Sequence, residues 1–224
     1  MIRLAKLVAL SLAFIVLICP KSYGQEPLTL KNTLTLATGE VIELPTPPGF
    51  FRVDGVSAEV DKYYSNEIVK IENRALFISD IRNFPENLLA HFDHQDKDWF
   101  SLRLPPFDMI WACADDRFEE ARKSLNATVE ELLERVKQNY ITPPKTNYVY
   151  GDVPNTIFIS RMPNLTNPYP PGLYAVTYWN GVFIEFNYNL GASHRSLSIE
   201  ELKTHEELLL NWVIETRKGL TTLP

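Results

Sequence analysis

Cysteine is almost absent from this chain of 224 residues, which contains only Cys19 and Cys113. Cys19 belongs to an N-terminal segment that we expect to be removed, so the remaining chain would hold one thiol and no intramolecular disulfide. The fold must then be stabilised by its hydrophobic core. Cys113 follows an apolar run typical of a buried strand, and the adjacent Asp115 and Asp116 would disfavour the thiolate that a catalytic cysteine requires. We therefore predict a buried structural thiol.

Glycine is scarce as well, with nine residues, and the familiar enzyme motifs are missing. The sequence contains neither a Gly-x-Ser-x-Gly nucleophile elbow nor a glycine-rich phosphate-binding loop. His194 and His205 lie near the predicted C-terminal helix, where we expect a surface or hydrogen-bonded role rather than general base catalysis. These features favour a protein that is not an enzyme and needs no cofactor, although a site assembled from distant residues would leave no local motif.

Basic residues are outnumbered by acidic ones, 22 against 28. Loss of the N-terminal segment would also remove Arg3, Lys6 and Lys21, which reduces the basic residues to 19 against the same 28 acidic ones. A domain of this charge repels phosphate groups, and no cluster of lysine and arginine in the sequence reverses the sign locally. The composition therefore argues against nucleic acid and anionic lipid surfaces as partners.

Long apolar runs are absent except near the N-terminus, where residues 7–19 carry no charge. A helix of these residues would be roughly 20 Å long, which is too short for a hydrocarbon layer of about 30 Å. Arg3 and Lys6 precede the run and Pro20 follows it, as in a secretory signal peptide. We predict that residues 1–24 are a signal peptide, so that no permanent membrane anchor remains after cleavage.

The predicted cleavage site lies near Gly24. Ser22 and Gly24 place small side chains at the two positions that a signal peptidase reads before a cut preceding Gln25. A lipid-modified Cys19 is the alternative, but Ile18 stands where that signal needs a small residue. We therefore expect an exported protein that is periplasmic or secreted.

Residues 25–224 are predicted to form a single α+β domain in which an antiparallel sheet, with a C-terminal β-hairpin, packs against helices. Short apolar or alternating segments favour strands, and turns separate them instead of regular crossover helices. The predicted strands are residues 41–44, 75–81, 87–93, 109–114 and 156–160, and residues 25–37 are either a further strand or an arm. Residues 161–172 are rich in proline and asparagine and are predicted to be a long loop.

The β-hairpin is the clearest local signal. Two segments rich in aromatic and β-branched side chains, residues 174–179 and 182–188, flank Asn180-Gly181, which suits the two positive φ angles of a type I′ turn. The two-residue loop fixes which residues lie opposite each other: Trp179 and Val182, Thr177 and Ile184, Ala175 and Phe186. The face with these six residues is almost wholly apolar, and the other face mixes apolar with polar side chains.

Helices are predicted at three places. Residues 57–70 carry apolar side chains at helical spacing, and Thr128 and Glu131 form a capping box before a helix of residues 129–140. Ser198 and Glu201 form a second capping box, which begins a helix that runs to about residue 218. Gly219 is the predicted C-terminal stop of that helix. We expect the apolar stripe of this last helix, which includes Trp212, to cover the apolar face of the hairpin.

The order of these elements resembles that of small exported bacterial proteins of unknown function. The resemblance depends on the proline-bounded strand near Pro45, the acidic helix of residues 129–140, the aromatic hairpin of residues 174–188 and the closing helix with Trp212. The architecture is also similar to that of PsbP-like α+β domains. The resemblance implies an antiparallel sheet packed against helices and, because that group is dominated by binding and assembly roles, a non-enzymatic module. It carries over no functional residue.

A cluster of histidine and carboxylate side chains occupies residues 91–98. On a strand, His91 and Asp93 share a face, and His94 could close a site from the following turn. These residue types bind metals, but the sequence contains neither a His-Glu-x-x-His motif nor a cysteine pair that would strengthen the prediction of a metal site. His91, Asp93 and His94 are therefore the candidate metal ligands, and a solvated polar loop is the alternative reading.

The sequence as a whole favours an exported binding or assembly module with an envelope or extracellular protein as its partner. Residues 168–174, rich in proline and tyrosine, could dock such a partner or simply turn into the hairpin. The alternative function is that of a hydrolase or metal-binding protein that uses residues 91–98.

Overall fold

The computed structural model describes residues 32–36, 38–54, 73–80, 107–114, 116–141, 147–161, 171–179, 181–194 and 197–221. Several predictions fall outside these residues and stay predictions. They are the signal peptide of residues 1–24, the helix of residues 57–70, the strand of residues 87–93 and the candidate metal ligands His91, Asp93 and His94.

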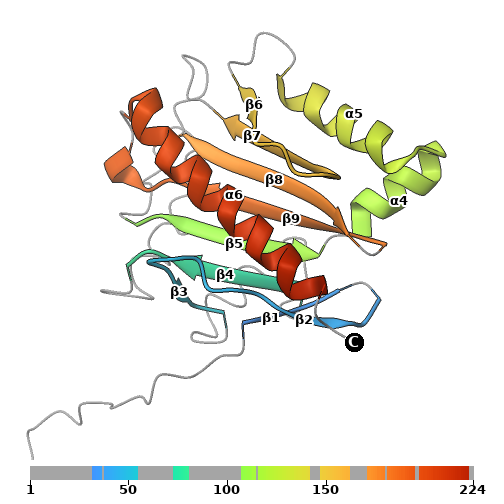
Figure 1. The fold of residues 1–224 in the computed structure, drawn as a ribbon, viewed down its shortest axis with the longest axis horizontal. Coiled ribbons are helices and arrows are strands. Elements are labelled where there is room, and N and C mark those ends of the chain that lie inside the picture. The colour runs from blue at the N-terminus through green and yellow to red at the C-terminus, as the bar shows by residue number, and fades with distance from the viewer. Residues whose placement is uncertain are drawn as a thin grey trace, which may run out of the picture.

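The centre of the fold is an antiparallel sheet of seven strands (Figure 1). Its strands are β3 (Phe51–Arg52), β4 (Arg74–Ile78), β5 (Met109–Ala114), β6 (Tyr148–Tyr150), β7 (Thr156–Arg161), β8 (Gly172–Trp179) and β9 (Val182–Asn189). They lie in the order β3-β4-β5-β9-β8-β7-β6. A separate two-stranded sheet consists of β1 (Thr33–Thr35) and β2 (Val41–Glu43). Together with the helices described below, this architecture confirms the predicted α+β class.

The β8–β9 hairpin has the predicted register. Trp179 lies opposite Val182, and the same register continues along both strands as expected. Gly181 has a φ angle of +87°, which a residue with a side chain rarely adopts, so the tight turn depends on this glycine. Because β9 also pairs with β5, the hairpin lies in the interior of the sheet.

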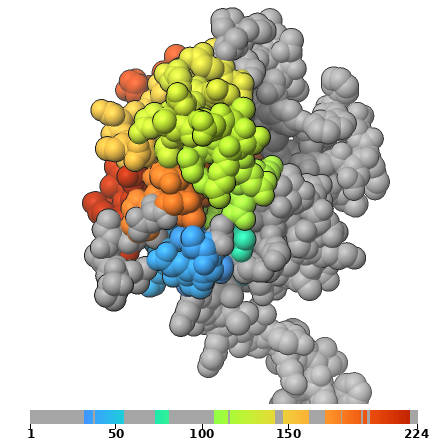
Figure 2. Space-filling view, turned by 90° about the vertical axis from the view of Figure 1, so that its right-hand side faces the viewer, coloured from blue at the N-terminus to red at the C-terminus, as the bar shows by residue number. Residues whose placement is uncertain are grey.

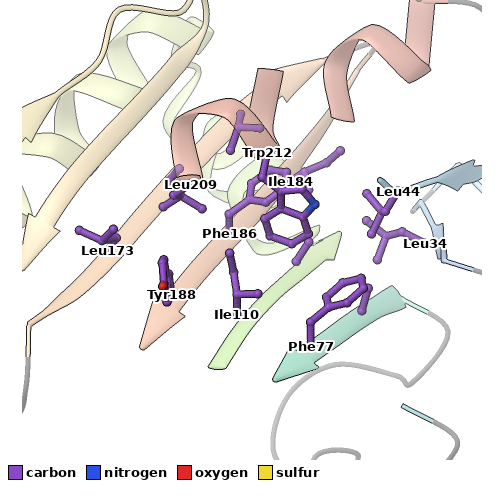
Figure 3. Close-up of a cluster of buried hydrophobic side chains, with 14 of the residues drawn as sticks. Leu34, Leu44, Phe77, Ile110, Leu173, Ile184, Phe186, Tyr188, Leu209 and Trp212 are labelled. Carbon is purple, nitrogen blue, oxygen red and sulfur yellow. The ribbon is translucent and has the colours of Figure 1, made fainter. Parts of the chain in front are cut away.

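One face of the sheet is covered by α6 (Ile199–Thr221), which crosses the strands in Figure 1. Trp212 is only 2% exposed and meets the rings of Phe186 and Phe77 edge to face, with centroids 5.1 and 5.7 Å away. Leu34 and Leu44, from the region of β1 and β2, belong to the same buried cluster (Figure 3). The prediction that α6 is a core element covering the hairpin is confirmed.

The capping box at the start of α6 is also confirmed. The Glu201 carboxylate accepts hydrogen bonds from the main chain and hydroxyl of Ser198, and the Glu201 main chain donates to that hydroxyl. The predicted stop at Gly219 is wrong, because the helix continues to Thr221. Gly219 keeps a helical φ angle and lies along β2, where an added Cβ would meet the Glu43 carbonyl oxygen at an ordinary 3.7 Å. A glycine ends a helix only where the chain turns into the left-handed conformation, which it does not do here.

The other face carries a helical hairpin that consists of α4 (Asp116–Leu125) and α5 (Val129–Ile141). Figure 2 shows these helices, in green and yellow, beside the β8–β9 hairpin in orange and the β1–β2 pair in blue. The capping box of Thr128 and Glu131 is confirmed at the start of α5. The α4 helix was not predicted, because its sequence is mostly charged and buries no residue.

Between the helices and the sheet lies a second apolar cluster. Leu132, Leu133 and Val136 of α5 are buried against side chains of β7, β8 and β9, among them Val176 and Phe183. The sheet is therefore covered on both faces, and the mixed face of the hairpin is buried too. Cys113 of β5 is buried, as predicted. Among the described residues no helix is long and apolar enough to cross a membrane.

Candidate functional site

Among the polar side chains on the sheet, two groups lie on opposite faces. The first joins α6 to the ends of β5 and β9, and it contains the two histidines that the sequence left unassigned. The second lies beneath α4 and α5, next to an open groove. Their hydrogen bonding decides which of them has capacity left for a ligand.

The first group is centred on Asp108, immediately before β5. One carboxylate oxygen, Oδ1, accepts a hydrogen bond from the main chain of Gly191 at 2.8 Å and lies 3.2 Å from Nε2 of His194. The other oxygen accepts from the hydroxyl of Tyr188 at 3.1 Å, and that hydroxyl also lies 2.7 Å from Nδ1 of His205. Asp108, Tyr188 and His205 are therefore hydrogen-bonded in a chain, and the His194 ring lies beside the Asp108 carboxylate.

Electrostatics in this group follow from burial. Burial raises the pKa of Tyr188, and the neighbouring Asp108 carboxylate raises it further. Burial also lowers the pKa of His205, against an opposing effect of Asp108. Neutral Tyr188 and neutral His205 are thus favoured. His205 has the hydrogen-bonded role that the sequence indicated, and His194 packs against its ring and lies beside Asp108. The group attaches α6 and the preceding turn to the sheet.

The second group borders a groove of about 720 Å³ between α4, α5 and the sheet. Phe118, Leu125, Leu132 and Val136 supply its apolar walls, and Leu125 is 47% exposed at the rim. Ligand sites typically have volumes of roughly 300–1,000 Å³ and mainly apolar linings with a few convergent polar groups. The groove fits this description.

The charged and polar side chains of the groove are unevenly distributed. Arg117 of α4 and Arg135 of α5 are exposed and line it from the helix side. Glu185 of β9 lines it from the sheet, where its carboxylate accepts a hydrogen bond from Asn187 at 2.7 Å. The groove thus has a cationic rim in a chain whose formal net charge is −6.

A pair of stacked tyrosines is part of the lining of the groove. The rings of Tyr140 and Tyr174 lie 4.9 Å apart at an angle of 28°, and their hydroxyls are hydrogen-bonded to each other. Burial raises the pKa of both tyrosines, and the charge of Glu185 raises that of Tyr174 further. Both hydroxyls therefore stay protonated at neutral pH and offer neutral, polar surface to a ligand.

Arg161, the last residue of β7, lies next to this tyrosine pair. Its guanidinium crosses Gly172 of β8 and donates from Nη2 to the side-chain oxygen of Asn189 at 3.0 Å. Its Nε is buried and has no hydrogen-bond partner in the described part of the protein. Burial lowers the pKa of Arg161, while Tyr140, Tyr174 and Glu185 partly oppose that shift.

A smaller cavity of about 340 Å³ lies where α4 meets the hairpin tip and the β1–β2 turn. Asp116, Glu119 and Glu120 line it, but Glu119 already forms a two-point ion pair with Arg122, at 2.6 and 2.8 Å. Within the described ranges, no three histidine, cysteine or acidic side chains converge to hold a metal ion. The metal hypothesis for His91, Asp93 and His94 concerns residues outside those ranges.

Sequence reasoning missed the groove because its parts come from distant segments. It assigned Arg161 to the start of a loop and gave no helix to residues 116–125. The docking hypothesis for residues 168–174 is tested only at its end, where residues 172–174 are in β8. One signal was present: Val176 and Phe183, on the mixed face of the hairpin, are too apolar for an exposed face and implied a second covering layer.

Comparison with known proteins adds a likeness of fold. No family model and no curated protein matches the chain. The structure is similar to the 1.9 Å crystal structure of the Ran-binding protein Mog1p of Saccharomyces cerevisiae, with 12% sequence identity and a TM-score of 0.34 over 84% of this chain and 91% of that chain. At this level the likeness concerns the arrangement of helices and strands and says nothing about function.

Proposed function

We propose that the protein is an exported binding module that holds a peptide segment of an envelope or extracellular partner in the groove between α4, α5 and the sheet. The observation that carries the proposal is the groove itself, with its apolar walls and cationic rim. Peptide-binding grooves combine apolar pockets for anchoring side chains with a polar rim, and aromatic residues and arginine are enriched at such interfaces.

Charge favours an acidic segment as the occupant. Arg117 and Arg135 face the groove from the helices, and Glu185 is its one acidic lining residue among those described. The rest of the chain is acidic overall, so an acidic partner would be attracted at the groove and repelled elsewhere. Leu125 and Phe118 would receive apolar side chains of the same segment.

Ala121 offers a direct test because it lines the groove with its small side chain. The chain of residues 25–224 would be used to select binders from a displayed library of random peptides. Peptides selected on the wild type should lose binding to Ala121→Trp, whose indole fills the groove. They should bind normally to Gln138→Trp, a matched change at an exposed position of α5 outside the groove lining.

The result is interpretable only if both variants keep their fold, which circular dichroism and thermal melting would check. Selected peptides should carry apolar residues beside acidic ones. Their binding should change the NMR chemical shifts of residues in α4 and α5. Peptides that bind Ala121→Trp as well as the wild type would contradict the proposal. A library that yields no binder would contradict it too.

A further inference from the structure

The groove is apolar at the end where α4 and α5 are joined. Leu125 and Leu132 are the lining residues nearest to the connecting residues 126–128, and Ala121 lies one turn earlier on α4. None of the three is charged, and the side chain of Leu125 is partly exposed although it is apolar. An exposed leucine next to a small alanine offers a seat for an apolar side chain of the bound segment.

Arg135 is the charged lining residue that follows this seat along α5. Other cations of the helix pair within it: Nζ of Lys137 lies 2.8 Å from the carboxylate of Glu134. Arg135 forms no ion pair with any residue that the structure describes. Glu131, one turn before it, bonds instead to the main chain of Thr128 at 2.8 Å in the capping box. The charge of Arg135 is therefore left for a partner.

The dimensions of the groove favour an extended segment over a helix. Tyr140 follows Leu132 by eight residues, so the lining of α5 is about 12 Å long. The volume of about 720 Å³ then corresponds to a mean cross-section of roughly 60 Å², whereas a helix with its side chains, about 10–12 Å across, needs roughly 80–110 Å². An extended chain is thinner, and about four of its residues would span the groove.

The spacing along an extended chain relates the apolar seat to the arginine. Successive side chains point to opposite sides, so residues two positions apart face the same way at a separation of about 7 Å. Arg135 follows Leu132 by three residues, which is about 5 Å along the helix axis. A side chain seated beside Leu132 therefore brings the residue two positions away to the level of Arg135, whose long side chain covers the difference.

We infer that Arg135 is a specificity-determining residue, which pairs with an acidic side chain two positions from the apolar side chain seated at Leu125 and Leu132. The inference depends on the proposed function, and it adds an extended conformation and a spacing to it. A helical segment would instead carry the acidic residue three or four positions from the seated one. In an extended segment, an acidic residue directly next to the seated one would point out of the groove.

Three heptapeptides of identical composition test the spacing. Each has blocked ends, a central phenylalanine, two glutamates and four serines. The glutamates stand one, two or three positions from the phenylalanine on both sides, so the direction of binding does not matter. NMR titration of the chain of residues 25–224 should show that the peptide with the two-residue spacing binds about threefold to fivefold more tightly than the others, as expected for one partly exposed ion pair.

Variants of Arg135 assign the preference to its charge. Arg135→Gln should bind the three peptides equally, whereas Lys137→Gln, which removes a cation outside the groove lining, should keep the preference. In Arg135→Glu, peptides with lysine in place of glutamate should show the same preference for the two-residue spacing. Arg135 is exposed, so its variants should keep the fold, which their NMR spectra would verify.

Equal affinity of the wild type for the three peptides would overturn the inference, and so would a preference that persists in Arg135→Gln. Tighter binding of the three-residue spacing would overturn it in favour of a helical occupant. Absence of binding by all three peptides would also count against it. The proposed function is judged separately, because peptides that bind the wild type and not Ala121→Trp support it whatever their spacing.

Discussion

The indole nitrogen of Trp212 donates a hydrogen bond to the main-chain carbonyl of Pro45 at 2.7 Å. The two residues are 167 positions apart in the sequence, and the bond ties α6 to the segment that follows β2. Pro45 lies beyond the paired residues of β2, so its carbonyl is outside the strand ladder and can accept from the helix. Trp212 thereby combines a buried ring with a satisfied polar atom, as a core tryptophan requires.

We expect Trp212→Ala to lower the free energy of unfolding by about 3–5 kcal/mol, because it removes a buried ring from between Phe77 and Phe186. Trp212→Phe should cost less, since it keeps an aromatic ring and loses the bond to Pro45. Urea denaturation would measure both. Ile199→Ala, at a position that is 62% exposed, is the control and should melt like the wild type. If Trp212→Ala has the same urea midpoint of unfolding as the wild type, Trp212 does not contribute to the core.

Two glycines should respond to alanine in opposite ways. A Cβ at Gly191 would lie 2.7 Å from the main-chain carbon and oxygen of Phe107, so Gly191→Ala should lower stability by roughly 1–3 kcal/mol. A Cβ at Gly219 has room inside α6, so Gly219→Ala should raise stability by up to about 1 kcal/mol. The melting temperatures of the two variants would test both expectations. A lower melting temperature for Gly219→Ala would contradict a helix that continues through Gly219.

The stability of the protein should depend on the protonation of His205. Burial lowers its pKa below the ordinary value of 6.5, so the folded protein binds fewer protons at His205 than the unfolded chain does. The free energy of unfolding should therefore fall as the pH is lowered through about 6.5 toward the folded pKa. Asp108 and Glu201 raise the pKa and His194 lowers it, and their combined effect is smaller than that of burial.

Unfolding measured between about pH 7 and pH 5 in the wild type and in His205→Asn would isolate this contribution. Asparagine keeps a polar group near the position of Nδ1 and does not titrate, so the variant should show a flatter pH dependence. A slope equal to that of the wild type would refute the argument, as would an NMR titration that gives His205 a pKa above 6.5.

Export predicts a defined new N-terminus. If residues 1–24 are a signal peptide, protein extracted from its native source should begin at or near Gln25, after the small residues Ser22 and Gly24. N-terminal sequencing or intact mass measurement would establish this. Recovery of a membrane fraction that still begins with Met1 would disprove cleavage.

Metal content tests the candidate ligands His91, Asp93 and His94. We expect the dialysed protein to contain no stoichiometric divalent metal, since the sequence offers no established ligand spacing there. Elemental analysis would measure it. About one equivalent per chain would reverse this expectation, and its loss in a His91→Ala/His94→Ala double variant would then assign the site.

Elements with local signals were predictable from the sequence. Asn180-Gly181 specifies the hairpin and its register because only such residues adopt the required turn. The capping boxes at Thr128 and Ser198 specify helix starts because the bonds involved are three residues apart. In contrast, α4 is mostly charged and depends on its packing beside α5, and the two residues of β3 have no pattern of their own.

The candidate site was not predictable in this way. The Arg161 guanidinium fits over β8 because Gly172 leaves space for it, and Tyr140 meets Tyr174 only after α5 has folded back over the sheet. These contacts join residues that are far apart in the sequence, and their spacing forms no motif from which a site could be recognised. The sequence did indicate that both faces of the hairpin needed covering, and the groove lies under the cover on the second face.

The place of β9 in the sheet has a consequence for how the chain folds. Among the described strands β9 comes last in the sequence, yet it lies between β5 and β8 and provides the hydrogen bonds that connect β3–β5 with β6–β8. Until residues 182–189 are available, the two parts can form only as separate, smaller sheets, each with an unpaired edge. Assembly of the sheet therefore waits for nearly the whole chain, and a chain truncated before Val182 would expose β5 and β8 to incorrect pairing.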